Sequence, residues 1–200
     1  MVGQRIAAVL LAAGSSSRMG EPKQLMDWGG KSLIEHAADT VLQTVCRPLV
    51  VVLGHQSHRM REVLAARPLL TIDNPDWQLG MGASLRVGAS AALAACPALE
   101  AVLITLCDQP NVRADQLARL IEVFDRQRPE IVASSYAGIR GVPAVLSRRV
   151  LDELETLEPT AGAKSLIERA ERNVVAVDLL EAADDIDTPA DLQRVRAGKS

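Results

Sequence analysis

The chain has 200 residues, of which 48% are hydrophobic and 24% are charged, so it can bury a sizeable core. Its formal net charge of −3 argues against a nucleic-acid-binding surface. Aromatic residues make up only 2%, and a core of Val, Leu, Ile and Ala suits a buried sheet covered by helices. This length predicts a single domain over residues 1–200.

Cysteine usage and the N-terminal segment bear on the compartment. Cys46, Cys96 and Cys107 form no C-x-x-C pair, and an odd number of cysteines suits a reducing environment. The apolar stretch near the N-terminus is too short to cross a membrane and lacks the cleavage pattern of a signal peptide. We therefore expect a cytoplasmic protein that binds neither a membrane nor nucleic acid.

Strand and helix patterns alternate along the chain. In chain order they predict a strand at residues 6–12, a helix at 32–44, a strand at 49–53, a helix at 57–66, a strand at 69–72, a helix at 81–95, a strand at 101–106, a helix at 113–126, strands at 130–134 and 143–146, a helix at 163–170, a strand at 174–177 and a helix at 188–195. This alternation predicts an α/β fold with a mostly parallel sheet between two helical layers. Ligands of such sheets bind beyond the carboxyl ends of the strands.

The first strand runs into a loop of small residues that contains two cations. Gly14 closes the apolar run, and Arg18 and Lys23 lie in the polar segment beyond it. Small residues let backbone N–H groups approach an anion, so the loop suits a phosphate. Its spacing matches neither the P-loop nor the dinucleotide-binding glycine pattern. The alternative is an ordinary Gly/Ser-rich turn with solvated basic residues.

Two acidic positions follow later strands. Asp108 comes two residues after the apolar run at 101–106, where a carboxylate is a hard oxygen ligand suited to Mg²⁺. The alternative is that Asp108 caps the next helix, although Asn111 is better placed to do so. The run from Asp184 to Asp187 directly precedes Thr188, which is a candidate N-cap of the helix expected at 188–195. Some of these carboxylates would therefore simply favour the N-terminus of that helix.

A third segment joins a turn to a helix. Asn74-Pro75-Asp76 forms a turn cluster, and the expected helix at 81–95 leaves exposed N–H groups near Gly82 and Ser84. Ser84 is placed either to donate to a ribose or phosphate or to cap the helix. We expect Trp77 to be a hydrophobic plug and not a stacking platform.

These motifs, in this order, resemble one enzyme family from Val9 to Leu192. L-A-A-G-x-S-x-R-M-G-x-x-K, N-P-x-W-x-x-G-M-x-x-S-L, C-D-Q-P, G-x-x-G-x-P and D-I-D-T-P-x-D-L are similar to motifs of the nucleotidyltransferases of molybdenum cofactor synthesis, and more narrowly of their cytidylyltransferase branch. The chain departs from the family at Val142, where relatives often carry His or Asn. The resemblance implies a three-layer Rossmann-like nucleotidyltransferase fold.

The resemblance also implies roles for particular residues. Arg18, Lys23 and Asp108 would be catalytic, and Asp108 would bind the metal with Asp187, or alternatively with Asp185. The acceptor would lie mainly against residues 134–170, with the nucleotide in the N-terminal half. The residues implied to bind nucleotide are Leu11, Ala12, Ala13, Gly14, Arg18, Lys23, Asn74, Gly82 and Ser84.

The implied reaction transfers CMP from CTP to the phosphate of molybdenum-bound molybdopterin, with Mg²⁺ as cofactor, and releases pyrophosphate. Relatives with L-A-A-G tend to use CTP and those with L-A-G-G tend to use GTP, so Ala13 indicates cytosine. Two alternatives stay open: the same reaction on another phosphorylated acceptor, or a carrier that delivers the finished cofactor to a molybdenum hydroxylase. The cations and carboxylates of the motifs argue against a purely non-catalytic carrier.

Overall fold

The computed structural model describes residues 5–15, 21–154, 160, 162–168 and 173–197. Seven strands of this described part form one sheet in the order β5-β4-β1-β6-β8-β7-β9. Only β8 runs against its neighbours, since it pairs antiparallel with β6 and β7 while the other pairs are parallel. The strands are β1 (Ile6–Ala12), β4 (Leu49–Leu53), β5 (Leu70–Asp73), β6 (Ala101–Leu106), β7 (Ile131–Tyr136), β8 (Ile139–Ser147) and β9 (Val174–Asp178).

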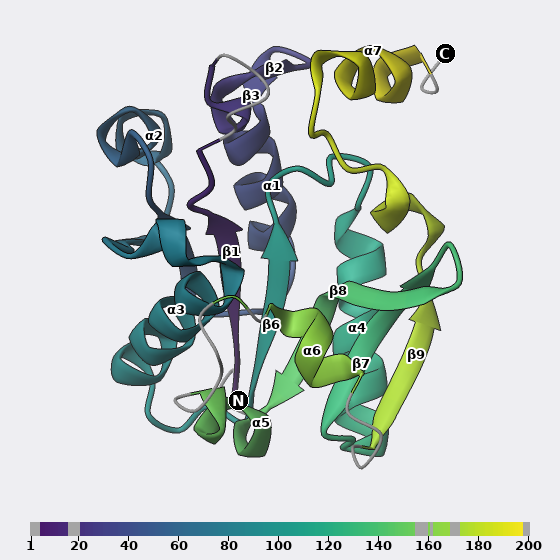
Figure 1. The fold of residues 1–200 in the computed structure, drawn as a ribbon. Helices are drawn as coiled ribbons and strands as arrows, with labels where there is room; N and C mark the ends of the chain where they lie inside the picture. The colour runs from purple at the N-terminus through teal and green to yellow at the C-terminus, as the bar shows by residue number, and fades with distance from the viewer. Residues whose placement is uncertain (1–4, 16–20, 155–159, 161, 169–172, 198–200) are drawn as a thin grey trace.

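Helices cover both faces of the sheet, which makes three layers (Figure 1). Alternate residues of a strand point to opposite faces, so Leu10 and Val9 enter different cores. One core packs against α1 (Leu33–Leu42), α2 (Ser57–Leu64) and α4 (Ala114–Gln127). The other packs against α3 (Met81–Ala95), α5 (Arg148–Asp152) and α6 (Ala163–Ile167). The predicted fold class is confirmed.

The buried strands and the longest helix follow the sequence prediction closely. The strands at 6–12, 49–53 and 101–106 and the helix at 81–95 have the predicted bounds. Helix α1 begins at Leu33, and Ser32 and Glu35 form the predicted capping box.

Other parts of the chain, above all residues 134–170, depart further from the prediction. β8 extends to nine residues because Ile139, Arg140 and Gly141 also pair with β7, and it runs antiparallel to both of its neighbours. Helix α5 was not predicted, and neither was the hairpin of β2 (Asp27–Trp28) and β3 (Lys31–Ser32). The predicted helix at 163–170 is described as Ala163–Ile167, and its last two residues lie outside the described part.

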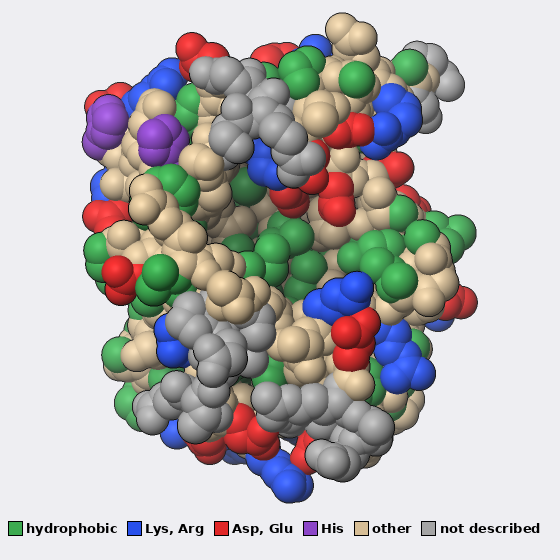
Figure 2. Space-filling model, in the orientation of Figure 1, with side chains coloured by type: hydrophobic (Ala, Val, Ile, Leu, Met, Phe, Trp, Pro, Cys, Tyr) green, Lys and Arg blue, Asp and Glu red, His purple; other side chains and the backbone are tan. Residues whose placement is uncertain are grey.

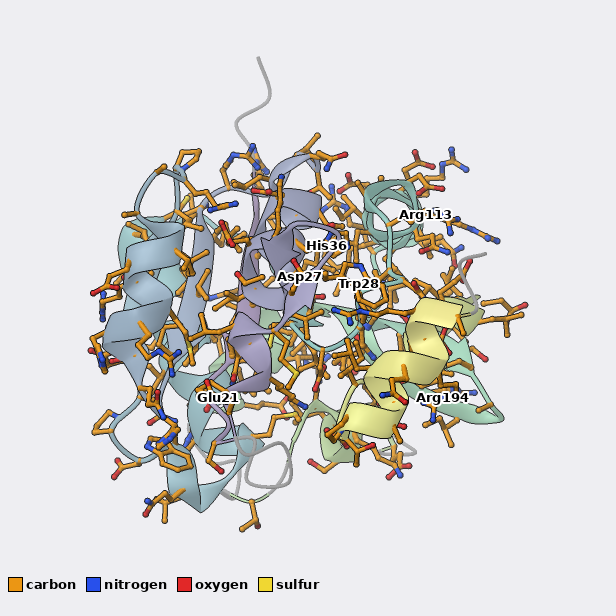
Figure 3. The ribbon with its side chains drawn as sticks, turned by 90° about the horizontal axis from the view of Figure 1, so that it is seen from above. Glu21, Asp27, Trp28, His36, Arg113 and Arg194 are labelled. Carbon is orange, nitrogen blue, oxygen red and sulfur yellow. The ribbon has the colours of Figure 1, made fainter. Side chains whose placement is uncertain are left out.

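The C-terminal helix α7 (Pro189–Ala197) lies beside the β2–β3 hairpin at the carboxyl end of the sheet (Figures 1 and 3). A small separate core of Trp28, Leu33, Ile186 and Val195 joins the two. Arg196 also donates to the backbone oxygen of Asp27. This packing brings the acidic segment before α7 back to the sheet. Among the described helices, none combines the length and apolar character that a membrane crossing requires.

Candidate active site

The two acidic positions meet at the carboxyl end of β6. The backbone N–H of Ile186 donates to the carbonyl oxygen of Asp108 at 3.0 Å. This bond places Asp185 and Asp187 on either side of the residue that is tied to Asp108. Two segments that are far apart in the chain therefore lie together where this strand ends.

Lys23 bridges the two carboxylates. It lies in the short 3-10 turn η1 (Lys23–Leu25), and its Nζ donates to Asp108 Oδ2 at 2.6 Å and to Asp187 Oδ1 at 2.7 Å. The side chains of Lys23 and Asp108 are 13% and 17% exposed, whereas that of Asp187 is 46% exposed. Burial by itself would lower the pKa of Lys23, but the charge and hydrogen bond of Asp108, with the bond to Asp187, raise it overall. The lysine is therefore fully charged.

The two acidic segments also carry carboxylate oxygens of the kind that a hard cation prefers. Asp108 Oδ1 and Asp185 Oδ1 are buried and have no hydrogen-bond partner among the described residues. Burial, with the nearby charge of Asp108, raises the pKa of Asp185 to about 6. No cluster of three or more His, Cys, Asp or Glu side chains in the described part has metal-site geometry. Mg²⁺ commonly uses only one or two carboxylates together with substrate phosphates and water, so the residues fit this ion.

A cavity of about 320 Å³ opens beside the carboxylates at the end of β1. Figure 2 shows a hollow in this face, with hydrophobic side chains at its base and both charge types at its upper rim. Trp77 and Met81 contribute apolar walls, and Ser15, Gln78 and Gly80 also line it. The predicted nucleotide-binding residues that line it are Leu11, Ala12, Ala13, Gly14, Lys23 and Ser84.

Three predicted nucleotide-binding residues are not among the described residues that line the cavity. Asn74 and Gly82 are not among the described residues that line this cavity, and Arg18 lies outside the described part of the chain. Asn74 is 1% exposed, and its Nδ2 donates to Ser84 Oγ at 3.0 Å. Ser84 is therefore held by a side chain and does not cap α3, whose N-cap is Gly80. Any direct contact of Asn74 or Gly82 with nucleotide remains a prediction.

The predicted helix caps have different outcomes. Asn111 does not cap α4, whose N-cap is Arg113; its Nδ2 instead donates to Asp184 Oδ2 at 2.9 Å. Thr188 does cap α7, because its Oγ1 accepts from Asp191 N at 3.2 Å and its own N–H donates to Asp191 Oδ2. That carboxylate also accepts from the backbone N–H of Asp187 at 3.3 Å. The cap therefore helps to fix the position of Asp187.

Two buried glutamines were not anticipated, and each adjoins a predicted catalytic residue. Gln24 Nε2 donates to the carbonyl oxygens of Ala12 at 3.1 Å and Gly14 at 2.7 Å. Gln109 Nε2 donates to the carbonyl oxygens of Ala182 at 2.8 Å and Val142 at 3.3 Å. Gln24 thus shapes the loop after β1, and Gln109 ties the end of β6 to β8 and to the 3-10 turn Leu180–Ala183. No sequence pattern identifies their partners.

A larger cavity of about 720 Å³ lies between α1 and the start of α4. Its walls include His36, Asn111, Arg113 and Glu181, and none of the predicted site residues. In the view along the carboxyl end of the sheet, His36 lies close to Trp28 and Arg113 lies near the periphery (Figure 3). The chemistry that the motifs predict is therefore concentrated at the smaller cavity.

The protein has a three-layer α/β fold with a cation, paired carboxylates and a loop of small residues at the carboxyl end of its sheet. This is the architecture of a nucleotide-binding enzyme. The model of the MobA-like NTP transferase domain matches residues 8–174, and the chain belongs to this family. It is thus a nucleotidyltransferase of the MobA-like type.

Two curated relatives span nearly the whole chain. The nicotine blue oxidoreductase of Paenarthrobacter nicotinovorans is 30% identical, over 95% of this chain and 96% of the relative. The molybdenum cofactor cytidylyltransferase of Escherichia coli is 25% identical, over 93% of both. One of these relatives is therefore named for molybdenum cofactor synthesis, and the other is named as an oxidoreductase.

Solved structures agree with the fold. Rv0371c of Mycobacterium tuberculosis H37Rv superposes with a TM-score of 0.80 at 30% identity, covering 96% of this chain and 97% of that one. The same protein has also been solved in complex with manganese, and that structure matches with a TM-score of 0.78 at 28% identity, over 96% and 97% of the two chains. A divalent metal is therefore bound by a protein of this architecture.

Proposed function

We propose that this protein transfers CMP from CTP to the terminal phosphate of molybdenum-bound molybdopterin and releases pyrophosphate. The observation that carries the proposal is the Lys23 bridge between Asp108 and Asp187 at the edge of the cavity after β1. It is supported by the similarity to a relative named a molybdenum cofactor cytidylyltransferase.

The proposed chemistry needs charge neutralisation and alignment more than proton transfer. The acceptor phosphate has a second pKa of about 6, so at neutral pH it is largely dianionic and needs no general base. Its oxygen forms a bond to the α-phosphorus of CTP while the bond from that phosphorus to the pyrophosphate oxygen breaks. The charged Lys23, with Arg18, would stabilise the triphosphate and the departing pyrophosphate.

Asp108, with Asp187 or Asp185, would hold Mg²⁺, which when bound supplies positive charge beside the phosphates. The orphaned oxygens of Asp108 and Asp185 support this assignment. The acceptor is expected against the strands and helices of residues 134–170.

The choice of cytosine is proposed to rest on Ala13. Its carbonyl oxygen accepts from the backbone N–H of His55 at 3.2 Å, and an added Cβ on Gly54 would lie only 2.5 Å from that oxygen. The backbone of Ala13 is therefore held closely, and Ala13 is one of the residues that line the cavity. A methyl group there would crowd a purine and leave room for a pyrimidine. Ala13→Gly should raise the use of GTP relative to CTP.

Three rival functions remain to be separated. One is the same transfer to another phosphorylated acceptor, such as a sugar phosphate, and a second is a carrier that hands the cofactor to a molybdenum hydroxylase. The third is an oxidoreductase, which the 30% identity to nicotine blue oxidoreductase favours.

The test is pyrophosphate release in the presence of Mg²⁺ and fresh molybdenum cofactor, with CTP, GTP, ATP and UTP compared. The proposal predicts release with CTP. Release that requires a different acceptor supports the first rival, and cofactor binding without release supports the second. Enzymatic reduction or oxidation of nicotine blue without pyrophosphate release supports the third.

A further inference from the structure

One side chain belongs at once to the nucleotide cavity and to the acidic pair. Lys23 lines the cavity, and its Nζ also contacts Asp108 Oδ2 and Asp187 Oδ1. The backbone of its turn is fixed, since Leu25 N donates to Pro22 O and Met26 N donates to Lys23 O, both at 3.0 Å. Rotation of the flexible lysine stem can therefore carry the ammonium between carboxylates and cavity while the backbone stays in place.

We propose that Lys23 acts as an internal counter-cation that competes with the divalent metal, so that metal binds well only together with the nucleotide triphosphate. This inference rests on the proposed function, because it concerns the same metal and the same phosphates. It gives Lys23 a role before the reaction as well as during it, and it makes metal and nucleotide binding cooperative.

The competition follows from the position and the positive charge of the Lys23 ammonium group. Mg²⁺ binds carboxylate oxygens at about 2.0–2.1 Å. Lys23 Nζ already lies 2.6 Å from Asp108 Oδ2 and 2.7 Å from Asp187 Oδ1. A metal ion bound by both of these oxygens would therefore occupy nearly the same space as Nζ. Because Lys23 and Asp108 are mostly buried, water screens the repulsion between the ammonium and a divalent ion only weakly.

The triphosphate relieves this competition. Its oxygens offer the ammonium a new set of charge-assisted hydrogen bonds, which frees the carboxylates to bind the metal. Each ligand then favours the arrangement that the other requires, and linkage makes the effect equal in both directions. Binding of metal alone should accordingly be weak, and binding of metal with CTP should be strong.

The test measures Mn²⁺ binding to the full chain by the paramagnetic resonance signal of free Mn²⁺, without and with CTP. Lys23→Met should bind Mn²⁺ alone about tenfold tighter than the unsubstituted protein, a change typical of coupling between sites. CTP should raise Mn²⁺ affinity in the unsubstituted protein but much less in the variant. The matched control is Lys31→Met, because Lys31 pairs with Asp39 in a different ion pair; its Mn²⁺ affinity should not change.

Lys23→Gln, which keeps a hydrogen-bond donor but no charge, covers the case in which the methionine variant fails to fold. It should also bind Mn²⁺ alone more tightly. Equal or weaker Mn²⁺ binding by the folded variants would overturn the proposal. Since Mn²⁺ binding is measured without turnover, this result is separable from the proposed function, which would fail through absent pyrophosphate release in the unsubstituted protein.

Discussion

Gln24 provides a demanding test of how the loop after β1 is held. Gln24→Met keeps the length of the side chain but removes the Nε2 donor from the carbonyls of Ala12 and Gly14. A buried acceptor left without its donor costs about 1–3 kcal/mol. Gln24 is 1% exposed, and its bond to Ala12 is buried while that to Gly14 is partly buried, so the free energy of unfolding should fall by about 2–4 kcal/mol.

The kinetic consequence separates binding from chemistry. In the proposed function the loop would contact nucleotide in the ground state and in the transition state alike, so its displacement should raise KM for CTP about tenfold with a smaller effect on kcat. Urea titration gives the stability and initial rates of pyrophosphate release give the constants. The control is Gln43→Met, which removes an exposed amide that donates to the carbonyl oxygen of Asp39. Unchanged stability and KM in Gln24→Met would refute the role assigned to this buried amide.

Three further predictions concern the carboxylate, the packing below the loop and pH. Asp108→Asn should lower kcat by about 10²–10³-fold at saturating CTP, and more than a tenth of normal turnover would contradict its catalytic role. Gly54→Ala should lose about 1–3 kcal/mol in a thermal melt, because its methyl group would meet atoms at 2.5 and 2.8 Å, whereas Gly14→Ala meets none within 4 Å and should retain its stability. The hydrogen bond from Arg67 lowers the pKa of Asp39 from its ordinary 3.8, so this pair stabilises the fold above about pH 4 and the stabilisation is lost as pH falls further. Arg67→Met should therefore lose stability at neutral pH and show a shallower decline below pH 4, and an unchanged acid profile would exclude the linkage.

The sequence predicted the central half of the fold well because the signal there is local. A continuous apolar run such as Ala101–Leu106 can be satisfied only by burial on both faces, which is the environment of a central strand. β8 was harder to predict, because its first residues, including exposed Arg140, pair at the rim of the sheet without an apolar pattern. Its reversed direction depends on which neighbours it meets, and local periodicity does not specify them.

The same division applies to the site. Charged residues in the segments that follow strands, such as Lys23 after β1 and Asp108 after β6, could be expected near one another because the topology of parallel sheets brings strand ends together. Gln24 and Gln109 were not, since a glutamine has no preferred partner until tertiary contacts place carbonyl groups in reach of its amide. For Asn111 the local pattern predicted the wrong partner. Asparagine is a good N-cap residue, but the side chain of Asn111 bonds to Asp184 in a distant segment and does not cap α4.

The most direct test of the account follows the fate of the α-phosphate. The protein would be incubated with Mg²⁺, molybdenum-loaded molybdopterin and equal amounts of CTP and GTP, each labelled at the α-phosphate, and the products separated and weighed by mass spectrometry. The account predicts that label from CTP appears in a cytosine dinucleotide of the cofactor, with unlabelled pyrophosphate released. Label recovered only as free nucleotide, or in a guanine dinucleotide, would contradict it.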